Sequence, residues 1–207
     1  MSKPTLILIG SGGHAHACID VIEQQDQYSV LGLIGTPNEI GQSILGHKII
    51  GTDDDLARLA KECQYALISI GQIQSPESRM RLYQRATELG FQLPVIISPK
   101  AHVSRHAAVG AGTIVMHGVI INAEAIIGNN CIVNSRALIE HDARVEDHCH
   151  ISTGAILNGG ARVGEGSFIG SGSLIKEGVS LGKRCLVGMG LCVRHDQSDN
   201  ARVMGNG

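Results

Sequence analysis

Residues 139–142 of this chain read Ile-Glu-His-Asp and hold its best candidate for acid–base chemistry. His141 is followed directly by Asp142, and histidine is the side chain whose unperturbed pKa lies nearest to neutral pH. A neighbouring carboxylate fixes the tautomer of an imidazole and favours its protonated form, as a general base requires. The pair His141 and Asp142 is therefore a candidate catalytic base.

The chain has ten histidines, and most carry no such neighbour. Isolated surface histidines are common in proteins. We assign His102, His106, His148 and His195 to that class, and we keep His150 as a second candidate for the site.

A glycine loop near the N-terminus is the second feature that could hold a ligand. Gly10, Gly12 and Ala15 match G-x-G-x-x-G/A between an apolar run at residues 6–9 and a helical segment at residues 15–25. Backbone amides and a helix N-terminus at such a loop bind phosphate, and His14 lies at its mouth. The alternative is that the glycines only permit a tight turn between strand and helix.

A nicotinamide cofactor is a poor fit to this loop. An NAD site also needs a carboxylate at the end of the second strand, about twenty residues further on, to bind the ribose hydroxyls. Residues 34–36 are Ile-Gly-Thr at that place. Binding of the phosphates of another nucleotide and a purely structural turn both stay open for this loop.

The elements that position these residues differ between the two halves of the chain. Strands at residues 6–9, 30–34 and 66–70 alternate with helices at residues 15–25, 54–62 and 75–89, which predicts a small Rossmann-like α/β domain over residues 1–94. The acidic run at residues 53–55 can cap the second helix, and Gly90 can end the third.

Residues 95–207 repeat with a period of six, which neither a helix nor an alternating strand produces. An aliphatic residue stands at every sixth position from Ile97 to Val193, and a series of mostly small residues from Ala101 to Leu191 stands four places after each. Three such hexads, eighteen residues, close one triangular coil of a parallel β-helix. The residues between the two series, His141 and His150 included, then project outward, and His150 lies half a coil beyond His141.

Composition limits the function further. The net charge of −2 gives no reason to expect nucleic acid or a membrane surface as partner. The first apolar run is too short for a signal peptide or a membrane span, so we expect a cytoplasmic protein. The six cysteines form no CxxC pair, and we expect buried thiols rather than disulfides.

The chain resembles, over nearly its whole length, the bacterial sugar acyltransferases that join a Rossmann-like domain to a left-handed hexapeptide β-helix. The resemblance is carried by the glycine loop with His14, by residues 69–71 (Ser-Ile-Gly), by residues 139–142 and by residues 150–152 (His-Ile-Ser). Members include nucleotide-amino-sugar N-acetyltransferases and sialic acid O-acetyltransferases. The resemblance implies a homotrimer with active sites between subunits, acetyl-CoA as donor, no metal, and a nucleotide-linked sugar held by the N-terminal domain.

The resemblance also implies roles for particular residues. His141 matches the general base that takes a proton from the sugar amine or hydroxyl, and Asp142 matches the acid beside it. His150 matches a residue near the acetyl group. The groove for the pantetheine arm matches Gly170, Ser171, Gly188 and Met189. The nucleotide-sugar pocket matches Gly12, Gly13, His14 and Gly71.

One departure from the family concerns the nucleotide. Members that use uridine nucleotides tend to have an acidic pair after the second strand, where this chain has residues 34–36 (Ile-Gly-Thr). The base or ribose must then be recognised differently, or the acceptor carries another nucleotide or none.

Three functions remain in competition at this stage. The first is acetyl-CoA-dependent N-acetylation of a nucleotide-linked amino sugar of the 4-amino-4,6-dideoxy type in surface polysaccharide or glycan synthesis, with O-acetylation of a sugar or sialic acid as its variant. The second is a zinc-dependent carbonic anhydrase, but its His-x4-His pattern fails because Glu146 stands five places after His141. The third is a solenoid scaffold with a ligand-sensing domain and no catalysis.

Overall fold

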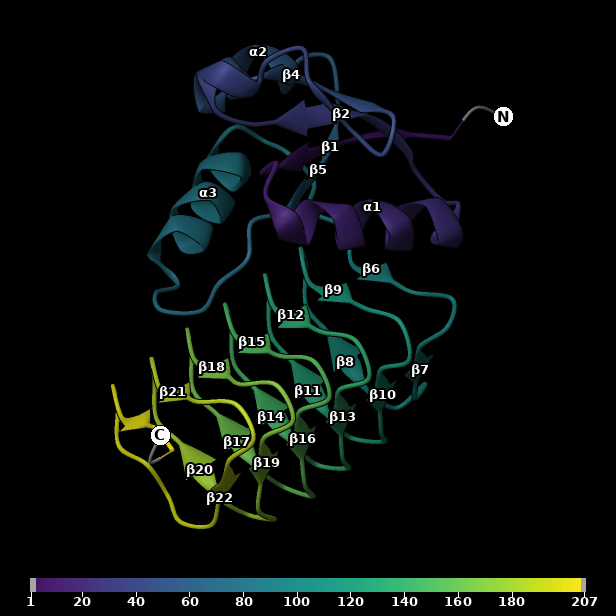
Figure 1. Cartoon of the computed structure of the whole chain (residues 1–207). Helices are drawn as coiled ribbons and strands as arrows, with labels where there is room; N and C mark the ends of the chain where they lie inside the picture. Colours follow the sequence, from purple (N-terminus) through teal and green to yellow (C-terminus); the bar gives the residue numbers. More distant parts are fainter. Residues whose placement is uncertain (1–2, 206–207) are drawn as a thin grey trace.

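An α/β unit lies along one side of a three-sided solenoid in the computed structural model, which describes residues 3–205 (Figure 1). The first strand, β1, lies between β2 and β5 in the sheet order β3-β4-β2-β1-β5, and its residues 6–9 are fully buried. The elements of the unit are β1 (Thr5–Ile9), α1 (Gly13–Gln25), β2 (Ser29–Ile34), η1 (Pro37–Glu39), β3 (Ser43–Ile44), β4 (His47–Gly51), η2 (Asp53–Asp55), α2 (Leu56–Leu59), β5 (Tyr65–Ile68) and α3 (Glu77–Glu88).

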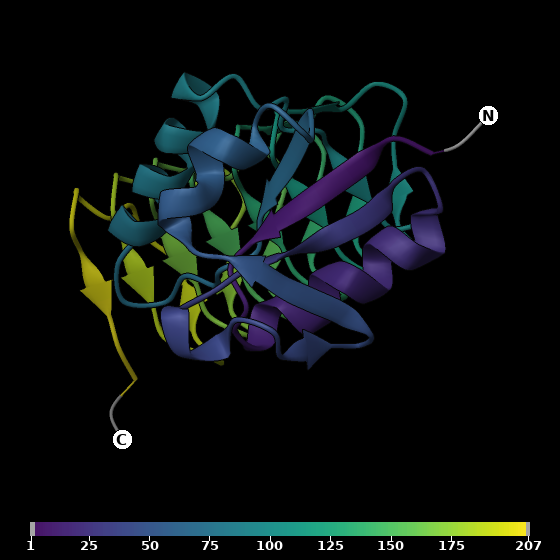
Figure 2. The ribbon, with the colours of Figure 1, turned by 90° about the horizontal axis from the view of Figure 1, so that it is seen from above.

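The sheet confirms the alternation predicted for this half. Strands β2, β1, β5 and β4 are parallel, with β1 between β2 and β5, so the ends of β1 and β2 lie next to each other beside the glycine loop. Figure 2 shows the sheet lying across the solenoid, with α1 and α3 near opposite edges. The loop after β5 is held at this edge, because the Ser69 hydroxyl donates a hydrogen bond to the Gly10 carbonyl over 2.7 Å.

Two local predictions were incomplete. The helix expected at residues 54–62 is shorter: Thr52 starts the 3-10 turn η2 with a capping box to Asp55, and α2 ends at Leu59. The hairpin of β3 and β4 was missed, because two-residue β3 is too short and β4 too polar at its start to give a strand pattern.

From residue 96 onward the chain forms two-residue strands that pair with strands eighteen residues away, for example Ile120 with Leu138. This confirms the predicted three-hexad coil of the β-helix. The strands are β6 (Ile96–Ile97), β7 (His102–Val103), β8 (Ala108–Val109), β9 (Ile114–Val115), β10 (Ile120–Ile121), β11 (Ile126–Ile127), β12 (Ile132–Val133), β13 (Leu138–Ile139), β14 (Arg144–Val145), β15 (His150–Ile151), β16 (Ile156–Leu157), β17 (Arg162–Val163), β18 (Phe168–Ile169), β19 (Leu174–Ile175), β20 (Ser180–Leu181), β21 (Leu186–Val187), β22 (Cys192–Val193) and β23 (Arg202–Val203).

The strands form three sheets, which are the three faces of the solenoid. We call the sheet of β6, β9, β12, β15, β18, β21 and β23 the covered face, because the α/β unit lies against it. The sheet of β7, β10, β13, β16, β19 and β22 is the apolar face. The sheet of β8, β11, β14, β17 and β20 is the polar face, and its outward column includes Arg144 and Arg162.

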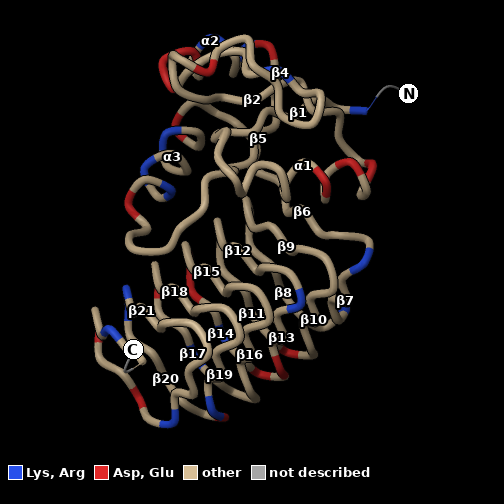
Figure 3. The backbone as a smooth tube through the Cα atoms, in the orientation of Figure 1, with Lys and Arg blue, Asp and Glu red and all other residues tan. Residues whose placement is uncertain are grey.

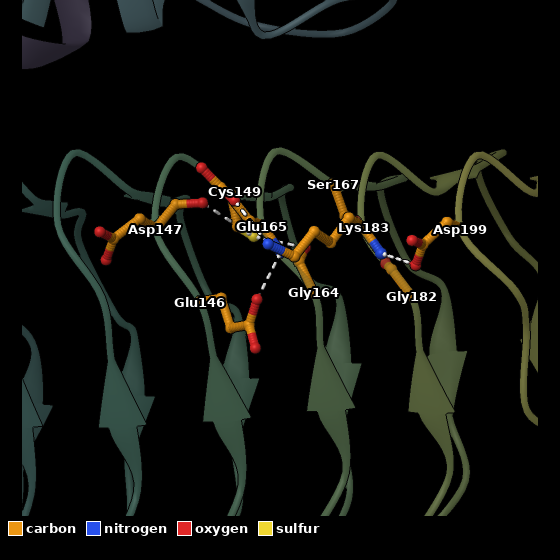
Figure 4. A network of polar contacts seen from close by, with 9 residues as sticks. All are labelled: Glu146, Asp147, Cys149, Gly164, Glu165, Ser167, Gly182, Lys183 and Asp199. Carbon is orange, nitrogen blue, oxygen red and sulfur yellow. Dashed lines mark hydrogen bonds and ion pairs between the residues drawn. The ribbon is translucent and has the colours of Figure 1, made fainter. Parts of the chain in front are cut away.

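The interior confirms the two predicted inward series, and it explains why several small residues carry a hydroxyl or thiol. Cys149 donates from Sγ to the Gly164 carbonyl of the next coil over 3.2 Å, and Ser167 donates from Oγ to the Gly182 carbonyl over 3.1 Å (Figure 4). Five cysteines are buried free thiols, as expected. Cys192 is exposed, contrary to that expectation, because it is the outward residue beside the inward Val193.

Carboxylates at one corner of the solenoid add hydrogen bonds between consecutive coils (Figure 4). Glu146 accepts a hydrogen bond from the backbone N–H of Glu165 over 3.0 Å, and Asp199 accepts one from the N–H of Lys183 over 2.8 Å. Each joins one coil to the next, so these acids are structural parts of the turns.

A buried arginine fastens the α/β unit to the covered face. The Arg79 side chain, 1% exposed, donates from Nη1 to the carbonyls of Ile68 and Ile70 over 2.6 and 3.0 Å and from Nε to the Asn130 carbonyl over 3.2 Å. Carbonyl acceptors replace part of the water that this cation loses on burial, while Nη2 is buried with no hydrogen-bond partner within residues 3–205. The arginine therefore joins the end of β5 to the coil that contains β12.

None of the helices in residues 3–205 has the length and hydropathy that a membrane crossing needs.

Candidate active site

The His141–Asp142 pair lies at the corner between the apolar and the polar face, in the turn between β13 and β14. His141 Nδ1 and Asp142 Oδ2 are 2.8 Å apart, and both side chains are about two-thirds exposed, 67% and 65%. With Asp142 ionised, Nδ1 carries the proton and donates it to the carboxylate, so Nε2 keeps its lone pair. The pair thus presents a basic nitrogen to solvent.

The electrostatics match this geometry. The pKa of His141 is raised, first by its hydrogen bond to Asp142 and then by the negative charges of Asp142 and Glu140. Asp142 has a φ of 61°, the left-handed conformation that other coils often fill with glycine. Asp142 therefore has two roles: its backbone forms the turn, and its carboxylate accepts the hydrogen bond from His141.

The chain contains a second His-Asp sequence, and the structure distinguishes the two. His195 stands in the same column as His141, three coils further on, and it is followed by Asp196. Asp196 Oδ1 instead accepts a hydrogen bond from the backbone N–H of Ser180 over 2.8 Å. His195 is exposed, as are His102 and His106, which fits their assignment as surface residues.

Gly159 is a residue of this corner that sequence reasoning missed. It lies one coil after His141, and a Cβ built on it would be 2.8 Å from Cε1 and 2.9 Å from Nε2 of the imidazole. The ring therefore lies over a position where only glycine leaves room. The eighteen-residue period could have found it, since 159 is the next member of the His141 column.

A second set of predicted residues meets in a cavity between the α/β unit and the covered face. The cavity has a volume of about 590 Å³. It is lined by the predicted nucleotide-sugar residues together with His150 and Asn134: Gly12, Gly13, His14, Gly71, Asn134 and His150, with Ala17, Ile70, Gln72 and Ile73 between them. The structure thus brings all four predicted acceptor residues to one place.

His150 points away from the solenoid core but is 7% exposed, because the α/β unit covers it. Its Nδ1 lies 2.6 Å from the Gln72 carbonyl and must donate the proton there. Burial lowers its pKa to about 4. His150 is therefore a neutral imidazole whose Nε2 lone pair is turned toward Asn134, 3.3 Å away.

His14, in the first turn of α1, is also neutral. Burial and the nearby Arg79 cation lower its pKa to about 3, and Nε2 is buried with no hydrogen-bond partner within residues 3–205. Such a nitrogen at the wall of a cavity is available to a bound molecule.

His148 is not an isolated surface histidine, contrary to the prediction. Its Nδ1 lies 2.9 Å from Asn130 Nδ2, and its ring packs edge-on against Tyr83 with centroids 5.4 Å apart. The contact comes from α3, which the repeat pattern alone does not place.

The four predicted pantetheine residues form one column at the corner between the covered and the apolar face. Gly170 and Ser171 follow β18, and Gly188 and Met189 follow β21. Ser171 Oγ is 2.9 Å from Ser152 Oγ of the preceding coil, and Met189 is 79% exposed. This corner and the His141 corner flank the apolar face on its two sides.

A second cavity, of about 600 Å³, opens at the ends of β1 and β2 and was not predicted. The glycine loop lines it together with three acids and an arginine, namely Glu39, Asp53, Asp54 and Arg81. Figure 3 shows acidic segments gathered at this end of the unit, near α2. The nucleotide phosphates expected at the glycine loop would lie in this cavity, against the loop.

Comparisons with known proteins agree with this architecture. Residues 5–86 match the family model described as the PglD N-terminal domain, and residues 160–194 match the hexapeptide repeat of succinyl-transferase. No curated protein sequence gives a match.

Solved structures of two proteins are similar over nearly the whole chain. PerB from Caulobacter crescentus, in complex with CoA and GDP-perosamine, is 32% identical with a TM-score of 0.92, covering 99% of this chain and 95% of that one. The acetyltransferase domain of PglB from Neisseria gonorrhoeae, in complex with acetyl coenzyme A, is 31% identical with a TM-score of 0.90, covering 99% and 98%. The chain belongs to this family of sugar acyltransferases.

WeeI from Acinetobacter baumannii, 20% identical with a TM-score of 0.84 over 98% of this chain and 97% of that one, shares the fold.

As a member of the sugar acyltransferase family, the protein is an enzyme that uses acetyl-CoA as its co-substrate. The scaffold interpretation is thereby wrong. Within residues 3–205 no three His, Cys, Asp or Glu side chains converge as metal ligands would.

Replacing Gly159 by Ala should disable His141, the candidate base, without affecting folding, because the new methyl group would displace its imidazole. A misplacement of about 1 Å can cost about a hundredfold in rate. We expect kcat to fall by about that factor while KM for both substrates stays unchanged in steady-state kinetics. The matched control is Gly160→Asn, since position 160 has a φ of 66° that Asn tolerates and no atom within 4 Å of its Cβ. Wild-type kcat in Gly159→Ala would contradict this role.

Replacing Asp142 by Asn should move the pH profile. Only neutral His141 can accept a proton, so kcat/KM rises as pH increases through its pKa. Loss of the Asp142 charge lowers that pKa, so the rising limb should shift to lower pH, and the plateau should fall because the base is weaker. Glu140→Gln, which removes the weakest of these influences, should shift the limb less. A limb that stays in place in Asp142→Asn would exclude the coupling.

Proposed function

We propose that the protein transfers the acetyl group of acetyl-CoA to the amine of a nucleotide-linked 4-amino-4,6-dideoxy sugar, in the synthesis of a surface polysaccharide or glycan. The observation that carries the proposal is the exposed, hydrogen-bonded His141–Asp142 pair at a corner of the β-helix. The GDP-perosamine bound to the Caulobacter enzyme supports the acceptor class. In two further crystal structures of that enzyme one histidine is replaced, by Asn or by Ala.

The proposed reaction needs one base and one leaving group. The lone pair of the sugar amine attacks the thioester carbonyl while His141 Nε2 takes the amine proton. The C–N bond forms, the C–S bond breaks, and the CoA thiolate leaves with the proton returned from His141. Asp142 stabilises the imidazolium that exists between these two proton transfers, as its effect on the pKa of His141 requires.

The acceptor is held, in this proposal, by the α/β unit. The N-terminus of α1 and the glycine loop supply backbone N–H groups for the diphosphate. The cavity that contains Gly12, Gly13, His14 and Gly71 receives the sugar, and the unpaired His14 Nε2 offers it a hydrogen-bond partner.

A second copy of the chain is needed to complete this site. Within one chain, His141 and the acceptor cavity lie on different sides of the solenoid, since the cavity adjoins the covered face and His141 stands at the opposite corner. We therefore propose a homotrimer in which the apolar faces meet around a threefold axis. The His141 corner of one copy would then adjoin the Gly170–Met189 corner of the next, where His150 and the pantetheine column receive acetyl-CoA.

The apolar face itself supports this arrangement. Its outward column runs Ile120, Leu138, Ile156 and Leu174 over successive coils, and Ile120 and Leu174 are 42% and 39% exposed. A continuous aliphatic stripe on a monomer is typical of an interface. We place the reaction in the cytoplasm, where free buried thiols persist.

The function is tested by offering purified enzyme acetyl-CoA with GDP-, UDP- and dTDP-linked 4-amino sugars and their hydroxyl analogues, and measuring thiol release and the acetylated product. We expect turnover with an amine acceptor, and a loss of about a hundredfold or more in kcat for His141→Ala. His195→Ala, in the same column, should keep wild-type activity. Full activity in His141→Ala would refute the base, and turnover only with hydroxyl analogues would refute N-acetylation.

The trimer is tested by placing charges on two faces. Ile120→Asp combined with Leu174→Asp should give a monomer in sedimentation analysis and abolish turnover, because carboxylates would be buried in the interface. Ile126→Asp is the matched control, since Ile126 is 40% exposed on the polar face. A double variant that stays trimeric, or an Ile126 variant that dissociates, would show that the interface is a different face.

A further inference from the structure

The end of β2 lacks the carboxylate that a Rossmann-like nucleotide site uses. In such sites an acid at this strand end, beside the glycine loop, accepts hydrogen bonds from the ribose hydroxyls. Here β2 ends at Ile34, and Gly35 and Thr36 follow. The second cavity opens at this same edge, and the glycine loop lines it.

A carboxylate nevertheless occupies that place, supplied from further along the chain. Glu39 folds back over the strand end, and its Oε2 accepts hydrogen bonds from Thr36 N over 2.8 Å, Thr36 Oγ1 over 2.6 Å and Ser11 Oγ over 3.0 Å. A Cβ on Gly35 would lie 3.0 Å from this oxygen. The carboxylate of Glu39 thus fills the space next to Gly35 that a side chain at residue 35 would take.

The same carboxylate is free to bind a ligand. Hydrogen bonds from Thr36 and Ser11 lower the pKa of Glu39, so it is ionised at neutral pH. All three of its hydrogen bonds use Oε2, and Oε1 makes none with residues 3–205. Glu39 lines the cavity together with Gly10, Ser11 and Gly12.

We propose that Glu39 accepts hydrogen bonds from the ribose hydroxyls of the nucleotide and so replaces the acid missing after β2. The inference rests on the proposed nucleotide-sugar acceptor. A carboxylate repels the diphosphate, which the glycine loop and the N-terminus of α1 attract instead. The ribose is joined directly to that diphosphate, so a carboxylate linked to the loop through Ser11 is placed for its hydroxyls.

The chain contains a matched control for the structural part of this role. Gly51, Thr52 and Asp55 repeat the arrangement at the end of β4: Asp55 Oδ2 accepts from Thr52 N over 2.9 Å, and a Cβ on Gly51 would lie 2.7 Å from it. Both loops are capping boxes of a 3-10 turn. Asp55, however, does not line the cavity. Removing it costs the same kind of cap and no ligand contact.

The test compares ribose with dideoxyribose by isothermal titration of the full-length enzyme. GDP and UDP are each titrated beside their 2′,3′-dideoxy forms into wild type, Glu39→Ala, Glu39→Gln and Asp55→Ala. Wild type should bind the better ribonucleotide about tenfold to a hundredfold more tightly than its dideoxy form, the usual effect of hydrogen bonds to a charged group. Glu39→Ala should lose this preference, and Asp55→Ala should keep it. Glu39→Gln retains an oxygen for the cap and should lose most of the preference while melting like wild type.

The proposal is overturned if Glu39→Ala, or Glu39→Gln where the alanine variant does not fold, keeps the wild-type preference. It is equally overturned if Asp55→Ala loses the preference to the same extent, or if wild type has none. Failure of the acetyl transfer itself would appear differently, as nucleotide binding with normal ribose preference but without thiol release.

Discussion

The hydrogen bonds between consecutive coils are the constraint on which the rest of the structure depends. Because the two-residue strands from β6 to β22 pair with strands eighteen residues away, their side chains stand directly above their counterparts in the next coil. An insertion within a coil would break this stacking, and the stacking determines which residues are neighbours. It puts Gly159 under the imidazole of His141, and it gives Cys149 a carbonyl of the next coil as acceptor.

The second constraint is the way the α/β unit lies on the covered face. The Arg79 guanidinium reaches carbonyls of both parts, so the loop after β5 and the coil of β12 are held at one separation. His150 is thereby enclosed and kept neutral, with its proton on the nitrogen that faces Gln72. The cavity proposed for the acceptor lies at this junction, while the proposed base, His141, stands at the far corner.

The sequence sufficed for the features that local rules determine. The period of six predicts the coils, their interior and the column of every residue, and the glycine loop predicts the turn from β1 to α1. The covering of His148 and His150 could not be predicted, because it comes from packing between elements far apart in the chain. His141–Asp142 and His195–Asp196 look alike in sequence, and only the turn geometry shows that Asp196 is already bonded to Ser180 N.

The two ends of the proposed site are under different degrees of restraint. The His141 corner belongs to the stacked array, where a side chain at residue 159 would contact the imidazole directly. The loop from Gly35 to Glu39 is exposed and held mainly by its own capping box. A carboxylate on this loop can therefore occupy the space at the end of β2 at little structural cost. Chemistry carried by the solenoid and nucleotide recognition carried by short loops can therefore change independently, since a substitution in the loop leaves every coil contact of the base in place.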